Sequence, residues 1–232
     1  MLIQYAEGQQ RSGRLGATIA SRNRYGSYYR AGTVPVNPST DRQAAIRGAL
    51  QALSIAWVTT LTQDQRDAWD LYGGNVSWLN RLGASVSLTG LSHYIRSNAS
   101  RLQAGLTRID DAPTTYALAP PEQALIMSAS EATQQLTCNF DDGAAWCDLD
   151  DAAQLLYVGR PVNPGVKYFG GPYRLLAVIE GDSVSAPTSP EAALDTPDWP
   201  FVAGQRLWVR TRITLPDGRL SEFAQTNFLA AA

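Results

Sequence analysis

The sequence changes its hydrophobic period across a proline-rich stretch near its middle. Before residue 110, apolar residues recur every three or four positions, as in amphipathic helices. After residue 122 they alternate with polar residues, as in half-buried antiparallel strands. The stretch between contains Pro113, Pro120 and Pro121, and proline interrupts both helices and sheets. The sequence therefore predicts an α+β chain with a linker at residues 113–122.

Three helices are predicted in a helical unit that covers residues 37–112. The first spans residues 41–60 and has an apolar face made of Ile46, Leu50, Leu53, Trp57 and Leu61. The second follows Thr62, which forms a capping box with Gln65, and ends at Gly73-Gly74 because glycine is common at helix ends. The third spans residues 89–104.

Short strands with alternating apolar residues fill the second half. The last two, 206–213 and 219–228, are joined by Pro216-Asp217-Gly218 and should form a hairpin. The other predicted strands are residues 123–129, 135–140, 153–159 and 172–180. Six or seven short strands favour an antiparallel β-sandwich of immunoglobulin or fibronectin-III type over residues 123–232, and we expect this region to fold alone.

Residues 1–36 are predicted to form an extended basic arm with hairpin-like pieces. The arm has glycines and short alternating stretches but few large aliphatic residues, so we expect it to dock on a partner. Its arginines and tyrosines are suited to acidic protein surfaces first and to nucleic acid second. The contact candidates are Arg11, Arg14, Arg22, Arg24, Arg30, Tyr25, Tyr28 and Tyr29.

The near-neutral net charge of -2 conceals two halves of opposite sign. Residues 1–109 hold 12 arginines and five acidic residues, whereas residues 110–232 hold seven basic and 16 acidic residues. Only Lys167 is a lysine, and arginine is the better residue for contacts with carboxylates, phosphates and rings. A compositional bias of the genome would explain the arginines equally well.

A second set of interface candidates lies near the C-terminus. Strand parity places Arg206, Trp208, Arg210 and Arg212 on one outward face, where an exposed indole between guanidinium groups would anchor a partner. The alternative is that the chain's own segments cover this face. Trp199 and Phe201 lie in a loop, residues 181–203, that is predicted to lack regular structure and to contact a neighbour.

Groups for catalysis are few. The single histidine, His93, lacks a serine, aspartate or cysteine partner and is predicted to lie at the surface or to cap a helix. Cys138 and Cys147 are predicted to be structural, and the acidic run at residues 141–151 is predicted to be a solvated loop rather than a calcium site. We expect no catalytic residues, metal, cofactor or membrane segment, so the chain is predicted not to be an enzyme; a hydrolase is the last alternative.

Three strings resemble a recurrent pattern of uncharacterised phage and prophage structural proteins. They are ASRNRYGSYYR, VNPSTDRQAAIRGAL and LTQDQRDAW, in which the motif NP-x-T-x-x-Q-x-x-x-R falls on Asn37, Pro38, Thr40, Gln43 and Arg47. The C-terminal RLWVRTRITLPDGRLSEFAQTNF is similar to the last two strands of fibronectin-III-like modules.

The resemblance implies a virion structural protein that is assembled in the host cytoplasm. It would be capsid-associated, at a vertex or the neck or as decoration, and its partners would be major capsid or connector proteins and further copies of itself. The alternative is a surface adhesion module whose sandwich loops bind carbohydrate or protein. An inward-facing nucleic-acid-binding head protein ranks third.

Overall fold

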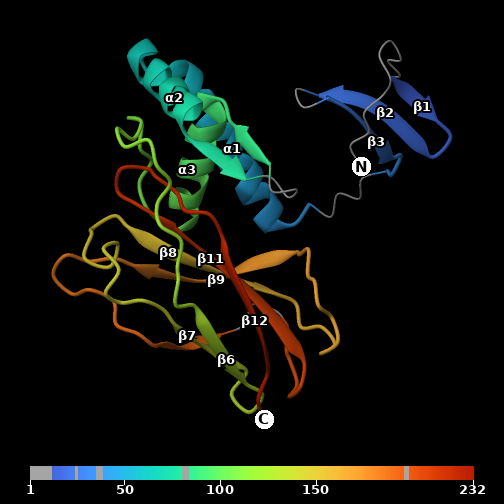
Figure 1. The fold of residues 1–232 in the computed structure, drawn as a ribbon, viewed down its shortest axis with the longest axis vertical. Coiled ribbons are helices and arrows are strands. Elements are labelled where there is room, and N and C mark those ends of the chain that lie inside the picture. Colours follow the sequence, from blue (N-terminus) through green and yellow to red (C-terminus); the bar gives the residue numbers. More distant parts are fainter. Residues whose placement is uncertain (1–11, 24–25, 35–38, 80–83, 196–198) are drawn as a thin grey trace. The chain divides into compact units, whose positions relative to one another are not determined.

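The computed structural model describes residues 12–23, 26–34, 39–79, 84–195 and 199–232 of the chain (Figure 1). In these residues it has three α-helices and several antiparallel sheets, which confirms a mixed α+β protein. The chain forms two compact units, Met1–Ala45 and Ile46–Ala232.

The first unit contains a three-stranded antiparallel sheet, drawn in blue in Figure 1. Its strands are β1 (Gly13–Leu15), β2 (Thr18–Asn23) and β3 (Gly26–Ala31), so the predicted hairpin-like pieces are present. Gly16 has a φ of 59° and makes the tight turn between β1 and β2, a conformation that glycine adopts at low cost. None of the described side chains from 12 to 45 is buried.

Helix α1 (Asp41–Thr59) is buried only in its C-terminal half. Leu53 and Ala56 are buried and Trp57 is half-buried, whereas Ile46 is 48% exposed and Leu50 is also exposed. The predicted apolar face therefore packs along its last turns only. The first three turns of α1 leave the apolar side chains of Ile46 and Leu50 exposed.

Helix α2 (Gln63–Asn75) begins with the predicted capping box. The Gln65 backbone N–H donates to Thr62 Oγ1 at 3.2 Å, and the Thr62 backbone N–H donates to Gln65 Oε1 at 2.9 Å. The predicted end at Gly73-Gly74 is wrong, because α2 continues to Asn75. A Cβ on Gly73 would lie 2.6 Å from the Leu88 carbonyl oxygen, so this glycine serves a close approach rather than a helix end.

Helix α3 (Gly90–Gln103) crosses α2 closely and starts at the N-cap Thr89. A Cβ on Gly90 would meet the Asp70 backbone nitrogen at 2.5 Å. The three helices share a core made of Leu53, Leu61, Trp69, Tyr72, Val76 and Tyr94. The two short strands β4 (Ser77–Leu79) and β5 (Ser85–Ser87), which were not predicted, pair between α2 and α3.

The remaining strands form two antiparallel sheets. One has the order β10-β7-β6, with β6 (Ile126–Ser130), β7 (Gln135–Asn139) and β10 (Glu191–Asp195). The other has the order β12-β11-β8-β9, with β8 (Ala153–Gly159), β9 (Tyr173–Glu180), β11 (Arg206–Thr214) and β12 (Ala224–Leu229). The hairpin of β11 and β12 is confirmed, and the expectation that residues 181–203 lack regular structure is wrong because they contain β10.

Residues of both sheets contribute to one hydrophobic core. Leu136 and Cys138 of β7 belong to it together with Leu156 of β8 and Val209 of β11. All of β8 is buried because its other face is covered too: Leu155 and Tyr157 pack in a smaller cluster with Ala104, which follows α3.

The proline-rich stretch 113–122 lies inside the second unit and has no regular secondary structure. Its Ala119 is part of the core of the two sheets, and Leu118 packs against the helical core. Whether this stretch separates two independently folding domains stays a prediction.

In the part of the chain that is described, no single helix has the length and apolar composition to cross a membrane. The pair α1 and α2 passes that test only when taken together, and the two helices are bent by 118°.

Candidate interaction surfaces

The sheet of the first unit divides the predicted arm residues between two faces. The register aligns Arg14 with Ile19 and Ile19 with Arg30, so both arginines share a face, and Tyr28 lies on it two residues along. Arg22 and Tyr29 lie on the opposite face by the same register. Arg11, Arg24 and Tyr25 fall outside the described residues.

The arginine row of β11 is largely covered by the chain itself. Trp208 is 7% exposed and Arg212 is 9% exposed, so the expectation of an open face is wrong for both residues. Strand parity identifies the face of a sheet but does not tell whether a second layer covers it. Arg206 and Arg210 stay partly exposed.

The guanidinium groups of this row contact rings and carbonyls of the second unit. Arg206 donates from Nε to the Pro164 carbonyl at 2.9 Å and also donates to Asn227 Oδ1. The Arg210 guanidinium lies 4.3 Å from the centre of the Tyr173 ring. Such stacking on rings is favourable for arginine even where its charge is partly desolvated.

Of the two aromatic residues predicted as loop anchors, only Trp199 remains near the surface. Phe201 is buried in the core of the two sheets, and its backbone N–H donates to Gln134 Oε1 at 3.0 Å. Its prediction as a surface anchor is therefore wrong. Trp199 is half-buried beneath the Arg174 guanidinium, which lies 4.5 Å from the ring centre.

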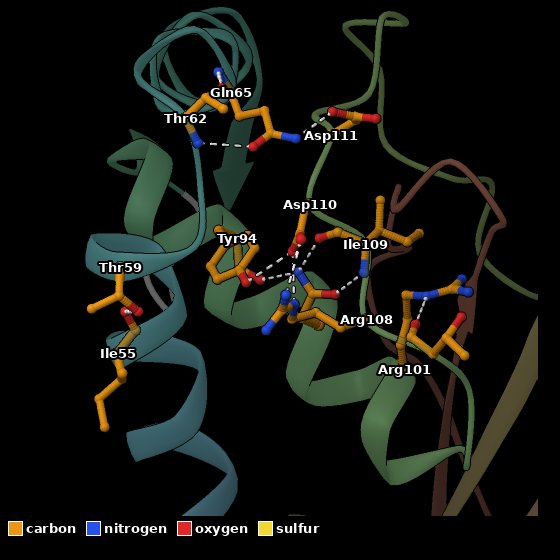
Figure 2. Close-up of polar contacts among 12 residues, drawn as sticks. Ile55, Thr59, Thr62, Gln65, Tyr94, Arg101, Arg108, Ile109, Asp110 and Asp111 are labelled. Atoms are coloured by element: carbon orange, nitrogen blue, oxygen red, sulfur yellow. Dashed lines mark hydrogen bonds and ion pairs between the residues drawn. The ribbon is translucent and has the colours of Figure 1, made fainter.

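A polar network fixes the segment after α3 to the helices. Figure 2 shows the Asp110 carboxylate between Arg108 and Tyr94: it accepts two hydrogen bonds from Arg108, at 2.7 and 2.9 Å, and one from the Tyr94 hydroxyl at 3.4 Å. Nearby, Gln65 donates to Asp111 Oδ1 at 2.8 Å. Burial raises the pKa of Tyr94 to about 12, so its hydroxyl stays protonated at neutral pH.

The prediction of a surface or capping position for His93 is wrong. Its side chain is 1% exposed and packs against the rings of Tyr72 and Trp78, with centroids 5.1 and 6.1 Å away. Burial and then the charge of Arg96 lower its pKa to about 4, so the imidazole is neutral at pH 7.

The buried face of α3 explains why sequence reasoning missed this position. Its buried residues recur at helical spacing as Gly90, His93, Tyr94, Ser97, Asn98, Ser100 and Arg101. Most of them are polar or small, so a search for large apolar residues does not find the face. The 3.6-residue period of small and polar residues is the signal that would have found it.

The cysteines and acidic residues of the second unit have structural surroundings. Cys138 and Cys147 are free and buried, and burial raises their pKa values to about 12 and 11. Asp150 accepts hydrogen bonds from both the backbone N–H and the hydroxyl of Ser183. Within the described ranges, no three histidine, cysteine or acidic residues are grouped to hold a metal ion.

Comparison with known proteins adds no relative: no family model, curated protein or solved structure matches the chain. The functional argument therefore depends on the surfaces themselves. They are the two faces of the β1-β2-β3 sheet, the exposed turns of α1 and the partly exposed Arg206 and Arg210 of β11. Each offers cations, rings or apolar side chains to a partner.

Proposed function

We propose that this chain is a structural protein of a bacteriophage particle and acts by protein–protein assembly rather than by catalysis. The observation that carries the proposal is the lack of any buried described side chain from 12 to 45. Ordering a residue costs about 1 kcal/mol or more of conformational free energy, which is normally offset by burial. A small sheet without a core of its own is therefore suited to a partner's surface.

The open turns of α1 and the sequence pattern support the same proposal. Ile46 and Leu50 are exposed on the helix that follows the sheet, and exposed apolar side chains on a regular element are typical of contact surfaces. The pattern from Asn37 to Arg47 that resembles phage structural proteins covers the start of this helix. The partners we propose are major capsid or connector proteins and further copies of the chain, in a virion assembled in the host cytoplasm.

The division of the arm residues favours protein over nucleic acid as the partner of the sheet. Arg14 and Arg30 lie on one face and Arg22 lies on the other. A nucleic-acid duplex bound to one face of the sheet would therefore contact only some of these arginines. A crevice between protein subunits contacts both faces at once. Acidic residues lining that crevice would match the arginines.

For residues 123–232 we propose an immunoglobulin-like or fibronectin-III-like sandwich that serves as an inter-subunit or outward module. Two antiparallel sheets that contribute to one core support this assignment.

Incorporation into particles tests the proposal. In a culture that produces the particles, the chain should co-sediment with them at a fixed copy number, and its absence from purified particles would overturn the proposal. The double variant Arg14→Glu/Arg30→Glu should lower incorporation at least about tenfold, because like charges across an interface cost several kcal/mol. Arg160→Glu, which changes an exposed arginine of the second unit, should incorporate normally. Incorporation that is equal for the double variant and the wild type would exclude this face of the sheet as the contact.

A further inference from the structure

Two arginines of β11 stack on the ring of Phe223, and a third arginine, on α3, lies over the ring of Trp78. The guanidinium carbons of Arg212 and Arg210 lie 3.7 and 4.2 Å from the centre of the Phe223 ring. Arg96, on α3, lies 3.6 Å from the centre of the Trp78 ring and is close enough for its charge to act on Arg212. We call Arg96, Arg210 and Arg212 the arginine cluster.

The cluster brings three positive charges together, of which Arg212 is buried and Arg96 and Arg210 are half-buried. Among the described residues, Glu222 is the one carboxylate that acts on Arg96, and no carboxylate acts on Arg212. Burial lowers the pKa of Arg212 to about 10; Tyr157 opposes the decrease, and the charges of Arg96 and Arg210 add to it. His93, next to Arg96, contributes no charge at pH 7.

Several buried donors of the cluster and its surroundings lack an acceptor. Nε of Arg96, Nε of Arg212 and Nε1 of Trp78 are buried and have no acceptor among the described residues. Within the described part of the chain, Arg212 donates one side-chain hydrogen bond, from Nη1 to Ser100 Oγ at 3.2 Å. A buried donor without an acceptor costs about 1–3 kcal/mol, so this place favours a group that brings several acceptors.

We propose that the arginine cluster binds an oxyanion, a phosphate or a carboxylate, beside the Phe223 ring. An oxyanion supplies acceptors to the Nε donors and offsets the repulsion among the guanidinium groups, whereas water supplies acceptors without charge. Arg96 and Arg210 are partly exposed and Phe223 is 37% exposed, so the anion reaches the cluster from solvent. The site lies within the second unit and does not depend on the proposed role in particle assembly.

Thermal melts of the full chain test the site. Sodium phosphate should raise the Tm with saturation in the millimolar range, beyond the effect of sodium chloride at the same ionic strength, because a ligand that binds only the folded state stabilises it. Disodium succinate tests a carboxylate in the same way. The anion whose effect on the Tm saturates at the lower concentration is the one that the site prefers. Equal melting temperatures in chloride, phosphate and succinate would overturn the proposal.

Variants and NMR spectroscopy test whether the anion binds at the arginine cluster. Arg210→Gln and Arg212→Gln should each lower the affinity for the anion at least tenfold. Arg160→Gln changes an exposed arginine elsewhere in the second unit and should bind the anion as the wild type does. In the wild type, the NMR signals of the Arg96 and Arg212 Nε–H groups should move as phosphate is added, which keeps the test decisive if Arg212→Gln fails to fold. Unchanged Nε–H signals, or equal loss of binding in Arg160→Gln, would contradict the site.

Discussion

Arg101 joins the helices of the second unit to its sheets although its side chain is only 1% exposed. Its guanidinium donates to the carbonyl oxygens of Thr107, Asp151 and Leu215 at 2.9, 3.0 and 2.9 Å. Asp151 and Leu215 flank strands of the four-stranded sheet. A single buried cation thus donates to carbonyls from three segments, one of which, that of Leu215, also accepts from the Gly218 backbone N–H at 3.0 Å.

Replacement of Arg101 by methionine should reduce the free energy of unfolding by about 3 kcal/mol. Methionine fills similar apolar volume but removes three hydrogen bonds from the guanidinium to backbone carbonyls, and each such bond contributes about 1 kcal/mol. Urea unfolding followed by circular dichroism measures the change. The control Arg160→Met, at an exposed position, should stay within about 0.5 kcal/mol of the wild type. A similar loss of unfolding free energy in both variants would mean that the hydrogen bonds of Arg101 do not stabilise the fold.

His93 predicts a pH dependence of stability in a range where few other side chains titrate. Its pKa is about 4 in the folded chain and about 6.5 when unfolded, so the unfolded state binds more protons between these values. The contribution of His93 to stability is therefore fully present above about pH 6.5 and is lost as the pH falls toward 4, by roughly 3 kcal/mol.

Urea unfolding at pH 7, 6 and 5 checks this dependence. His93 is the only histidine, so His93→Gln should remove most of the slope between pH 7 and 5. A slope that persists in this variant would assign the effect to carboxylates.

At the residue scale, sequence reasoning succeeded where the interaction is local and failed where it is tertiary. Thr62 and Gln65 were identified because a capping box lies within four residues. Trp208 was placed correctly on a strand, but its burial depends on segments far away in the sequence. Arg101 was missed because a buried cation is recognised only from the carbonyls that surround it.

Two adjacent glycines in α2 have opposite roles, and this difference can be measured. Gly73→Ala places a Cβ 2.6 Å from the Leu88 carbonyl oxygen, so we expect a loss of about 2 kcal/mol as the backbone shifts. Gly74 has nothing within 4 Å of the same position, so Gly74→Ala should stabilise the chain by roughly 0.5–1 kcal/mol through higher helix propensity. Thermal or urea unfolding of the pair checks both signs; equal effects would contradict the close approach.

Longer elements were predicted well, because periodicity accumulates with length. The predicted strand 153–159 matches β8, and 172–180 differs from β9 by one residue. β10 was missed because its five residues, EAALD, do not alternate and two of them are acidic. It forms a strand through its pairing with β7, which the local sequence does not contain.

At the scale of the whole molecule, two fragments of the chain test whether the stretch 113–122 is a linker between independent domains or part of one cooperative unit. Residues 46–232 should melt in one cooperative transition near the Tm of the full chain, because the described part of the first unit buries no side chain. Residues 119–232 should be less stable and more prone to aggregate, since Leu155 and Tyr157 lose the cover of Ala104.

Scanning calorimetry and size-exclusion chromatography of the two fragments provide the measurement. If residues 119–232 remain monomeric and melt at the same temperature as residues 46–232, the stretch 113–122 separates independent domains, as the sequence predicts. A lower Tm for the shorter fragment would make the helices and sheets one cooperative unit.

The two buried thiols can report when the hydrophobic core of the chain opens. Cys138 and Cys147 are free and fully shielded, and their raised pKa values leave almost no thiolate for an alkylating reagent. Iodoacetamide should therefore label the native chain only as fast as its core exposes these sulfurs, and mass spectrometry would count the adducts. A cysteine introduced at any exposed position would be the single fast-reacting site, so fluorophores and crosslinkers can be attached without first removing the native cysteines.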